Sequence, residues 1–567
     1  MLSRMSRRFL LFCLSSLLAI GCARQGYPEG GPRDREAPVV TNETPANGTL
    51  NFNAPSFYIA FDEYVVVQDA DNNVIISPPM RPKPTFTTKG RGILVTLNDT
   101  LQPNTTYLFQ FKNAIADFHE GNKLATHDYA FSTGNTIDSM TIAGTVLDAM
   151  TLGARKEVVT LMLYPADSPD SCIAHQQPSH ITRSNADGSF RFTHLKPGHY
   201  RIVAIEDADK DLRHGPNEAI AFADGPAVAH AATDSTAETL QMLMSFEPRQ
   251  VQRVAQSGFV REGYAEVVSV MPMQNPSVQT DTALVWRLSP QRDTLRIWTR
   301  NPSGRLLHLV LTDSSGLHDT LKMQWRPRRS KTGASTTAPS WCQWSIGTTL
   351  PYFQPMRLTF TTPLDTLRSR PDSAVVVMRV ADSSRRICRL IADSTLMSAT
   401  VDFVPMSNEK YEVTLIASQM YNILGATTDS LKVSTEVQGE DKFGAILVKI
   451  HQSDSQSRYV VQLTDESGKV LQSQKIEESG RVDFRRLTPA TYRIQAFADR
   501  NGDGLWTPGN YYQHRQPEPY YFMGKSLTLR ANWDIEEDFT VGGTPKPNLL
   551  QPADTKSTSK STMPTFR

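Results

Sequence analysis

The feature that most constrains the fold of this chain is a series of short hydrophobic runs with a period of two. Such runs include 57–61 (FYIAF), 93–97 (ILVTL), 107–111 (YLFQF), 294–298 (TLRIW) and 374–380 (AVVVMRV). β-branched and aromatic residues in this alternation are typical of half-buried strands. The 36 prolines and many Asp, Asn, Gly and Ser turns separate the runs. The sequence therefore predicts an all-β protein of several tandem β-sandwich domains.

Two segments of the chain are copies of each other. Residues 187–211 (DGSFRFTHLKPGHYRIVAIEDADKD) align without a gap with residues 479–503 (SGRVDFRRLTPATYRIQAFADRNGD). A repeat of this kind indicates one folding unit that is present twice. Each copy predicts a strand, a turn with proline and a long second strand. The matched pairs are Gly188 and Gly480, Phe192 and Phe484, Leu195 and Leu487, Pro197 and Pro489, Tyr200 and Tyr492, and Asp207 and Asp499.

The repeated pattern resembles the carboxypeptidase-regulatory, transthyretin-like family. The resemblance covers residues 138–235 and 441–541, and Ala490 replaces the turn glycine in the second copy. It implies a small β-sandwich at each place. The family belongs to a fold that is shared with glycan-binding domains, so the resemblance also implies a carbohydrate-binding-like fold.

A second resemblance concerns the region before the first copy. Pro38, Pro45, Gly48 and the triplet 61–63 (FDE) follow the pattern of the bacterial Ig-like domain first described in S-layer proteins. The resemblance implies an Ig-like domain at 37–135.

A weaker repeat implies a second Ig-like domain at 349–438, because Asn104 and Tyr107 match Asn408 and Tyr411. The region 240–345 between the repeats has further strand-like runs and is expected to be a β-rich domain.

The first residues have the pattern of a secretory signal that ends in a lipidated cysteine. Three arginines precede an apolar stretch shorter than the about 20 residues that a spanning helix needs. Residues 19–22 (AIGC) resemble the bacterial lipobox, in which the cysteine receives fatty acyl chains such as palmitate. We expect a signal peptide at 1–21, an acylated Cys22 and a Gly/Pro-rich tether at 22–36. The alternative is an ordinary cleaved signal with an incidental cysteine.

The order of these elements resembles a family of envelope lipoproteins with an N-terminal Ig-like domain, to which no reaction is assigned. Ala23 follows the cysteine where an inner-membrane lipoprotein often has Asp, so the outer membrane is the expected location. The membrane face, periplasmic or external, stays open. The polar tail at 542–567 is expected to be disordered.

Composition argues against nucleic acid as a partner and limits how far disulfides can stabilise the fold. The chain has 59 basic and 58 acidic residues and a net charge of +1, so nothing favours binding to nucleic acid. Three cysteines follow Cys22, namely Cys172, Cys342 and Cys388, and three cannot all pair. A bridge from Cys342 to Cys388 is one arrangement, and free buried thiols are the other.

The best chemical motif is DRNGDG at 499–504. Asp499, Asn501 and Asp503 stand at alternate positions, and Ca²⁺ prefers several oxygen ligands around one centre. The motif matches the first half of an EF-hand loop, but Asn510 stands where the bidentate Glu belongs, so a calcium site in a β-loop is the prediction. The alternative is a polar turn.

The first copy of the repeat carries a related motif, a triad of acidic residues at alternate positions, and ion binding there is the weaker expectation. The triad is Asp207, Asp209 and Asp211.

No catalytic motif stands out, so an enzyme is not expected. The expected function is a non-catalytic, lipid-anchored envelope protein that acts as a structural or partner-binding module. The alternative function is a carbohydrate-binding accessory lipoprotein, for which an exposed aromatic platform is the candidate site. The same aromatic side chains would also suit a strand and its core. The platform residues are Tyr511, Tyr512, Tyr520, Tyr521 and Phe522.

Overall fold

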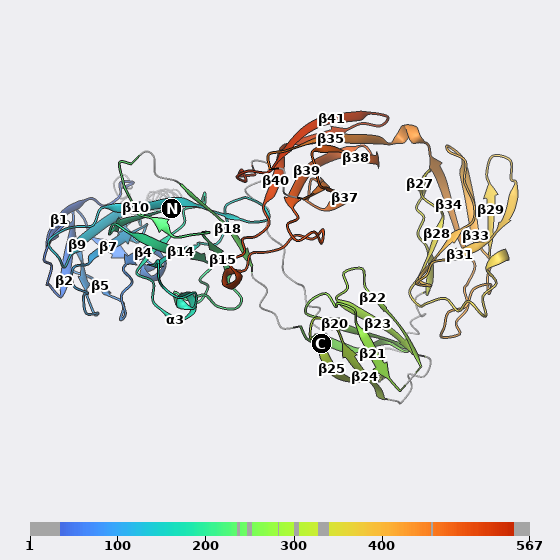
Figure 1. Cartoon of the computed structure of the whole chain (residues 1–567), viewed down its shortest axis with the longest axis horizontal. Coiled ribbons are helices and arrows are strands. Elements are labelled where there is room, and N and C mark those ends of the chain that lie inside the picture. Colours follow the sequence, from blue (N-terminus) through green and yellow to red (C-terminus); the bar gives the residue numbers. More distant parts are fainter. Residues whose placement is uncertain are drawn as a thin grey trace, which may run out of the picture. The chain divides into compact units, whose positions relative to one another are not determined.

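The computed structural model of the chain describes residues 34–234, 239–246, 252–281, 283–299, 306–326, 340–454 and 458–548. Strands dominate this part of the chain (Figure 1), and its α-helices α2 (Ala70–Asn73) and α3 (Cys172–His175) have four residues each. The prediction of an all-β protein with tandem β-sandwich domains is therefore confirmed. Within the described ranges, the search for an apolar helix of membrane-spanning length found none.

Several predicted features lie outside the described residues. They are the signal peptide at 1–21, the acylated Cys22, most of the tether and the end of the tail from 549 onward. The described cysteines Cys172, Cys342 and Cys388 are buried and form no disulfide. Hydrophobic cores therefore hold the described domains together.

The chain divides into two compact units. The first contains Met1–Val146, Lys156–His214 and Ala223–Met242, and the second contains Leu147–Arg155, Gly215–Phe222 and Leu243–Arg567. Each unit is described by itself below.

The first unit begins with a sandwich of two main sheets, β1-β2-β6-β5 and β4-β7-β9, with the short pair β3-β8. Its core is rich in aromatic rings, of which Phe57 and Tyr129 stack at 4.1 Å. The alternating burial of β2 reproduces the period of the run at 57–61. The strands are β1 (Val40–Thr44), β2 (Ser56–Phe61), β3 (Val65–Val67), β4 (Val74–Ser77), β5 (Thr85–Thr88), β6 (Gly92–Thr96), β7 (Thr106–Phe111), β8 (Ile115–Asp117) and β9 (His127–Ser132).

The first copy of the repeat follows. In the first unit β11 pairs with β12 and β14, and β10 pairs with β13 and β17. In the second unit β15 pairs with the end of β18. The strands are β10 (Met140–Asp148), β11 (Thr160–Pro165), β12 (His180–Arg183), β13 (Ser189–Leu195), β14 (His199–Ile205), β15 (Ala219–Phe222), β16 (Ala227–Val228), β17 (His230–Ala231) and β18 (Leu240–Phe246).

Two further two-sheet sandwiches belong to the second unit. One joins β19-β20-β23-β22 to β21-β24-β25, and the other joins β26-β28-β32-β31 to β27-β34-β33-β29-β30. The strands of the former are β19 (Val254–Arg261), β20 (Tyr264–Ser269), β21 (Ser277–Thr280), β22 (Leu284–Leu288), β23 (Thr294–Thr299), β24 (Leu306–Thr312) and β25 (His318–Gln324). Those of the latter are β26 (Cys342–Trp344), β27 (Thr349–Pro351), β28 (Arg357–Phe360), β29 (Val375–Arg379), β30 (Arg385–Cys388), β31 (Leu390–Ala392), β32 (Ser398–Val401), β33 (Lys410–Leu415) and β34 (Leu431–Gln438), with the 3₁₀ turn η1 (Pro371–Ser373).

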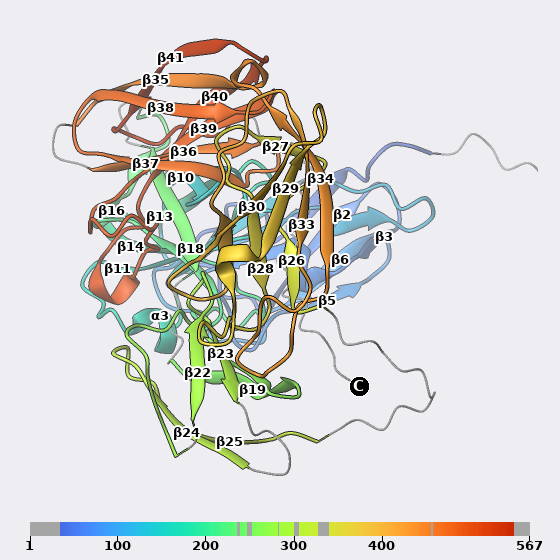
Figure 2. The ribbon, with the colours of Figure 1, turned by 90° about the vertical axis from the view of Figure 1, so that its right-hand side faces the viewer.

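The second copy of the repeat forms the last sandwich. The sheet β38-β35-β41 makes one layer and β37-β36-β39-β40 the other (Figure 2), and their facing side chains form one core. The long β39 contains the run that aligns with β14. The elements are β35 (Gly444–Gln452), β36 (Tyr459–Asp465), β37 (Val470–Ile476), β38 (Gly480–Leu487), β39 (Ala490–Ala498), β40 (Tyr520–Leu529) and β41 (Asp534–Val541), with the 3₁₀ turns η2 (Glu440–Lys442) and η3 (Tyr511–Gln513).

Candidate functional site

The loop that follows β39 holds the three predicted calcium ligands in one tight turn. Asp499 is buried, with 2% of its surface exposed, and its Oδ2 accepts the N–H of Gly504 at 2.9 Å. Asn501 Oδ1 accepts the N–H of Asp503 at 3.0 Å. Asp503 Oδ1 in turn accepts the N–H of Leu505 at 2.6 Å. The alternate spacing in the sequence therefore becomes a loop wound around side-chain oxygens.

Glu518 is buried beside this loop and holds its two ends. Its Oε1 accepts the N–H of Arg500 at 2.7 Å, and its Oε2 accepts the N–H of Thr507 at 2.9 Å. Burial raises the pKa of the Glu518 carboxyl, and the nearby Asp499 carboxylate also raises it. Trp506 Nε1 donates to the Glu518 carbonyl at 2.7 Å. Glu518 could not be found from the sequence, because it belongs to no motif and comes to lie beside the loop only when the chain folds.

The first copy of the repeat contains the same loop after β14. Asp207 Oδ2 accepts the N–H of Leu212 at 3.2 Å, as Asp499 Oδ2 does in the second copy. Asp209 Oδ1 accepts the N–H of Asp211 at 3.3 Å. Asp211 Oδ1 accepts the N–H of Arg213 at 2.7 Å. The carboxylate oxygens of the three aspartates lie within 4.8 Å of one another. The two copies thus share one hydrogen-bond pattern.

The backbones of the two loops also correspond. Lys210 and Leu212 have φ angles of 61° and 60°, in the left-handed region, and their counterparts Gly502 and Gly504 have 77° and 81°. Glycine adopts this region without strain, whereas residues with a Cβ do so at a cost. The first copy therefore keeps the loop conformation without the residue type that favours it.

Each copy places one cation at the same register position beside its loop. The β11 residue that pairs with Ile205 of β14 pairs on its other side with Arg183 of β12. The β36 residue that pairs with Phe497 of β39 pairs on its other side with Lys475 of β37. Since Ile205 and Phe497 are aligned in the repeat, Arg183 and Lys475 are structural counterparts.

Arg183 points its guanidinium at the first domain of the same unit. It donates to the carbonyl of Asn72 and, at 3.1 Å, to that of Asp71. Lys210 of the loop donates to the side chain of the same Asn72. Burial lowers the pKa of the Arg183 guanidinium, and the nearby Asp207 carboxylate offsets part of that shift. The first loop is therefore part of a joint between two domains.

Lys475 lies over its own loop instead. Its Nζ is 3.9 Å from Asp499 Oδ2 and donates to the carbonyl of Gly502 at 3.3 Å. The side chain of Lys475 is 57% exposed, so it can move into solvent without losing a buried contact. The second loop thus has a weakly held cation near its carboxylate.

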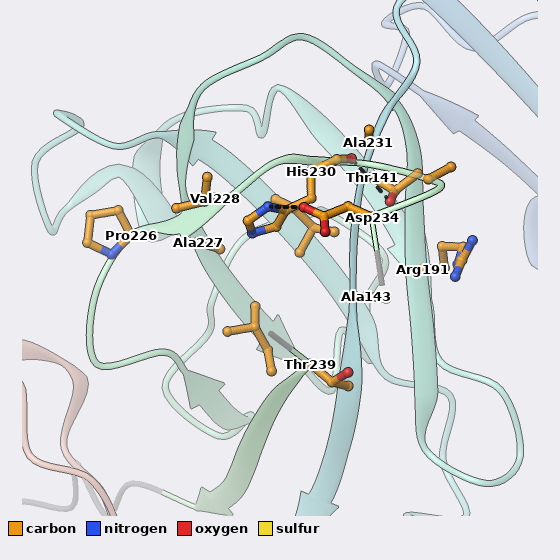
Figure 3. A pocket seen from close by; sticks show the side chains of 13 residues that line it. Thr141, Ala143, Arg191, Pro226, Ala227, Val228, His230, Ala231, Asp234 and Thr239 are labelled. Carbon is orange, nitrogen blue, oxygen red and sulfur yellow. Dashed lines mark hydrogen bonds and ion pairs between the residues drawn. The ribbon is translucent and has the colours of Figure 1, made fainter. Parts of the chain in front are cut away.

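A separate pocket of about 250 Å³ lies beside β10 and β17 in the first unit (Figure 3). His230 Nδ1 is 3.6 Å from Asp234 Oδ2, and Thr141 Oγ1 donates to the His230 carbonyl at 3.4 Å. Thr141 and His230 also pair across the two strands. The strand pairing and the Thr141 hydrogen bond therefore fasten the two-residue β17 to β10. The described residues that line the pocket include no serine or cysteine.

The tyrosine-rich segment does not form the exposed platform that the sequence suggested for glycan binding. Tyr511, Tyr520 and Tyr521 are buried, and Tyr512 is 40% exposed. Tyr521 belongs to the core between the two sheets.

The other two buried rings have different neighbours in the second unit. Tyr520 belongs to a cluster with Leu152 and Phe497, and Tyr511 meets the ring of Phe222 at 5.3 Å. Phe522 is half-buried and packs against the same cluster. The segment therefore serves packing within this unit.

Comparison with known families identifies the first domain. Residues 34–133 match the family described as "Bacterial Ig-like domain". The predicted Ig-like resemblance of this domain is confirmed, and the transthyretin-like and lipoprotein resemblances remain predictions. A search of curated protein sequences found no match.

Solved structures with similar strands share little sequence with this chain. The TIE protein of Bacillus anthracis is 8% identical, with 90% of this chain and 76% of that one covered and a TM-score of 0.12. The major pilin subunit BcpA of Bacillus cereus is 10% identical, with 70% and 98% covered and a TM-score of 0.14. Domains 1–6 of the surface layer protein SbsC are 10% identical, with 86% and 67% covered and a TM-score of 0.12. Such low TM-scores support no functional conclusion.

Proposed function

We propose that this chain is a non-catalytic protein of the cell envelope, anchored by acylated Cys22, that acts as a structural or partner-binding arm. The lipobox-like residues 19–22 support the anchor, and the match to the bacterial Ig-like family supports a chain built from inert sandwich modules. The observation that carries the proposal is the joint between the first two domains.

Hydrogen bonds along this joint bind the two domains into one unit. Ile181 of β12 donates its N–H to Ser77 Oγ of β4 at 3.2 Å. Thr106 Oγ1 of β7 lies 2.8 Å from Asp138 Oδ2, to which it donates, and it accepts the Asp138 N–H at 3.0 Å. Together with Arg183, these contacts tie strands of one domain to strands and the connecting segment of the next. A pair of domains fixed in this way suits a rigid arm better than a flexible string.

The joint also encloses a cavity of about 420 Å³. Its lining combines apolar side chains such as Met80 and Phe86 with charges of both signs. The charged residues are Arg81, Lys83, Arg183, Lys210, Asp71 and Asp207. Apolar area supplies affinity and the charges supply orientation for a bound segment. This cavity is the place where we expect an envelope partner to contact the arm.

Photocrosslinking in intact cells tests the proposal. A photoreactive residue replaces Thr85, which is exposed and lines the cavity, and in a matched control it replaces Asn53, which is exposed elsewhere in the same domain. We expect the Thr85 variant to capture one envelope protein and the control to capture none. Equal or absent capture by both would contradict a partner at the joint.

The anchor has its own test. Cells fed an alkyne-labelled fatty acid should incorporate it into the wild-type chain and not into a Cys22→Ala variant. Release of the wild-type chain from membranes by salt alone, without detergent, would contradict a lipid anchor, because acyl chains are held by the bilayer and not by charge.

A further inference from the structure

Among the fully buried carboxylates of the described residues, one has an oxygen without a hydrogen-bond partner. The buried acidic residues are Asp117, Asp365, Asp499 and Glu518. Backbone N–H groups satisfy both oxygens of Asp117 and Glu518, and Asp365 has N–H groups on one oxygen and Arg368 near the other. Asp499 Oδ1 has no hydrogen-bond partner among the described residues. A buried charged oxygen without a partner is costly, so this atom points to a ligand.

Comparison with the first copy shows how this oxygen becomes available. Asp207 Oδ1, its counterpart, accepts the N–H of Asp211 at 3.0 Å. In the second copy the equivalent N–H, that of Asp503, is bonded to Asn501 Oδ1 alone. The aspartate Oδ1 therefore accepts a hydrogen bond from its own loop in the first copy, whereas the same atom in the second copy accepts none from the described residues.

The other side chains of this turn offer oxygen ligands. Asn501 and Asp503 stand in the same turn, and Asn501 Nδ2 donates to Asp503 Oδ2 at 3.0 Å and to Thr507 Oγ1 at 2.9 Å. Both side chains are at the surface, so they can exchange these bonds for an ion. Glu518 keeps the ends of the loop in place through its two backbone contacts, and its buried negative charge favours a cation nearby.

We propose that the loop from Asp499 to Thr507 binds one Ca²⁺ ion through Asp499 Oδ1 and the side-chain oxygens of Asn501 and Asp503. Carboxylate and amide oxygens without nitrogen or sulfur donors suit a hard cation. A loop that contributes side chains from a flexible turn suits Ca²⁺, which accepts irregular geometry, better than Mg²⁺, which demands an octahedron. Lys475 moves into solvent when the ion enters.

The first loop does not bind the ion, although its three aspartates lie closer together. Asp207 Oδ1 already accepts the N–H of Asp211. The positive charges beside this loop are those of Arg183 and Lys210, which are both hydrogen-bonded to Asn72 of the first domain. Arg81 also donates to the carbonyl of Asp211 at 2.5 Å. These fixed cations repel a metal ion. This inference is independent of the lipid anchor and of the partner-binding role.

Terbium luminescence on the full chain tests the proposal, because Tb³⁺ replaces Ca²⁺ and Trp506, which belongs to the loop, can sensitise its emission. We expect saturable emission that Ca²⁺ reverses and Mg²⁺ does not, and calorimetry should give one Ca²⁺ per chain with a Kd of about 10⁻⁴ M. Asp499→Asn should weaken Ca²⁺ binding at least about tenfold, since it removes a charged ligand. Asp503→Asn, at an exposed position where folding is safe, should weaken it by less.

The matched control is Asp207→Asn in the first loop, which should bind Ca²⁺ as the wild type does. Trp506→Phe should lose the emission and keep the calorimetric binding. Absence of binding at millimolar Ca²⁺ would overturn the proposal and leave a buried water as the partner of Asp499 Oδ1. Loss of binding in Asp207→Asn, with binding kept in Asp499→Asn and Asp503→Asn, would also overturn it.

Discussion

The loops after β14 and β39 have the same backbone and the same three hydrogen bonds, yet their surroundings differ. In the first copy Arg183 reaches out of its own sandwich to Asn72, whereas its counterpart Lys475 rests on its own loop. Asp207 Oδ1 is bonded within the loop, and Asp499 Oδ1 is not. The comparison teaches that a duplicated loop takes its role from the neighbouring elements. One copy takes part in a joint between two domains, and the other has a buried carboxylate oxygen without a hydrogen-bond partner among the described residues, on which the proposed ion site rests.

The largest effect is expected from removing Glu518, which holds the two ends of the second loop. Glu518→Ala leaves the part-buried N–H groups of Arg500 and Thr507 without their acceptor, and each lost bond costs about 1–3 kcal/mol. We expect the last sandwich to lose about 3 kcal/mol of unfolding free energy. Denaturant unfolding measures this loss, and faster hydrogen exchange of the two amides reports the broken bonds. Glu518→Gln, which keeps one acceptor, should fall between, and an unchanged exchange rate in Glu518→Ala would contradict the role.

The second largest effect is expected at the joint between the first two domains, to which the first loop contributes. Arg183→Ala removes hydrogen bonds to the carbonyls of Asn72 and Asp71 and should weaken the contact by about 1–2 kcal/mol. Faster hydrogen exchange of the Ile181 amide, which bonds across the joint, is the readout. The matched variant Lys475→Ala should leave that amide unchanged. If the Ile181 amide exchanged equally fast in both variants, Arg183 would stabilise the joint no more than Lys475 does.

A smaller effect should follow from the backbone that the loops share. Gly504→Ala puts a Cβ at a φ of 81° and should cost the last sandwich about 1 kcal/mol. Leu212→Gly relieves the same conformation in the first copy but loses a half-buried side chain, so its net effect should be near zero. Thermal unfolding of each variant measures the two changes. A stabilising Gly504→Ala would show that the loops do not share this conformation.

The smallest effect tests whether Lys475 competes with the ion. Lys475→Ala removes a positive charge 3.9 Å from Asp499 Oδ2 and should tighten Ca²⁺ binding about threefold. Calorimetry on the full chain gives the change, and Arg183→Ala is the control that should not alter it. Weaker binding in Lys475→Ala would mean that this side chain supports the site.

Sequence reasoning succeeded where residues close in the chain determine the structure. The period-two runs became strands, and the spacing of Asp499, Asn501 and Asp503 placed them in one turn. Glu518 and Lys475 were not predictable, because they come to the loop from other segments.

The aromatic platform was wrong for a related reason. Tyr520 and Tyr521 are neighbours on β40, so they face opposite sides of the sheet. A strand with one exposed side would present one of them to solvent. The cluster with Leu152 covers the second side, and that segment lies far away in the sequence. A local sequence pattern does not predict a contact between segments so far apart in the chain.

Anomalous scattering from crystals of the full chain soaked in Tb³⁺ tests the central comparison most directly. The account predicts one strong peak enclosed by Asp499, Asn501 and Asp503, and no peak within the loop of Asp207, Asp209 and Asp211. A peak in the first loop with none in the second would contradict it, because the neighbours of the two loops would then not decide which of them binds the ion.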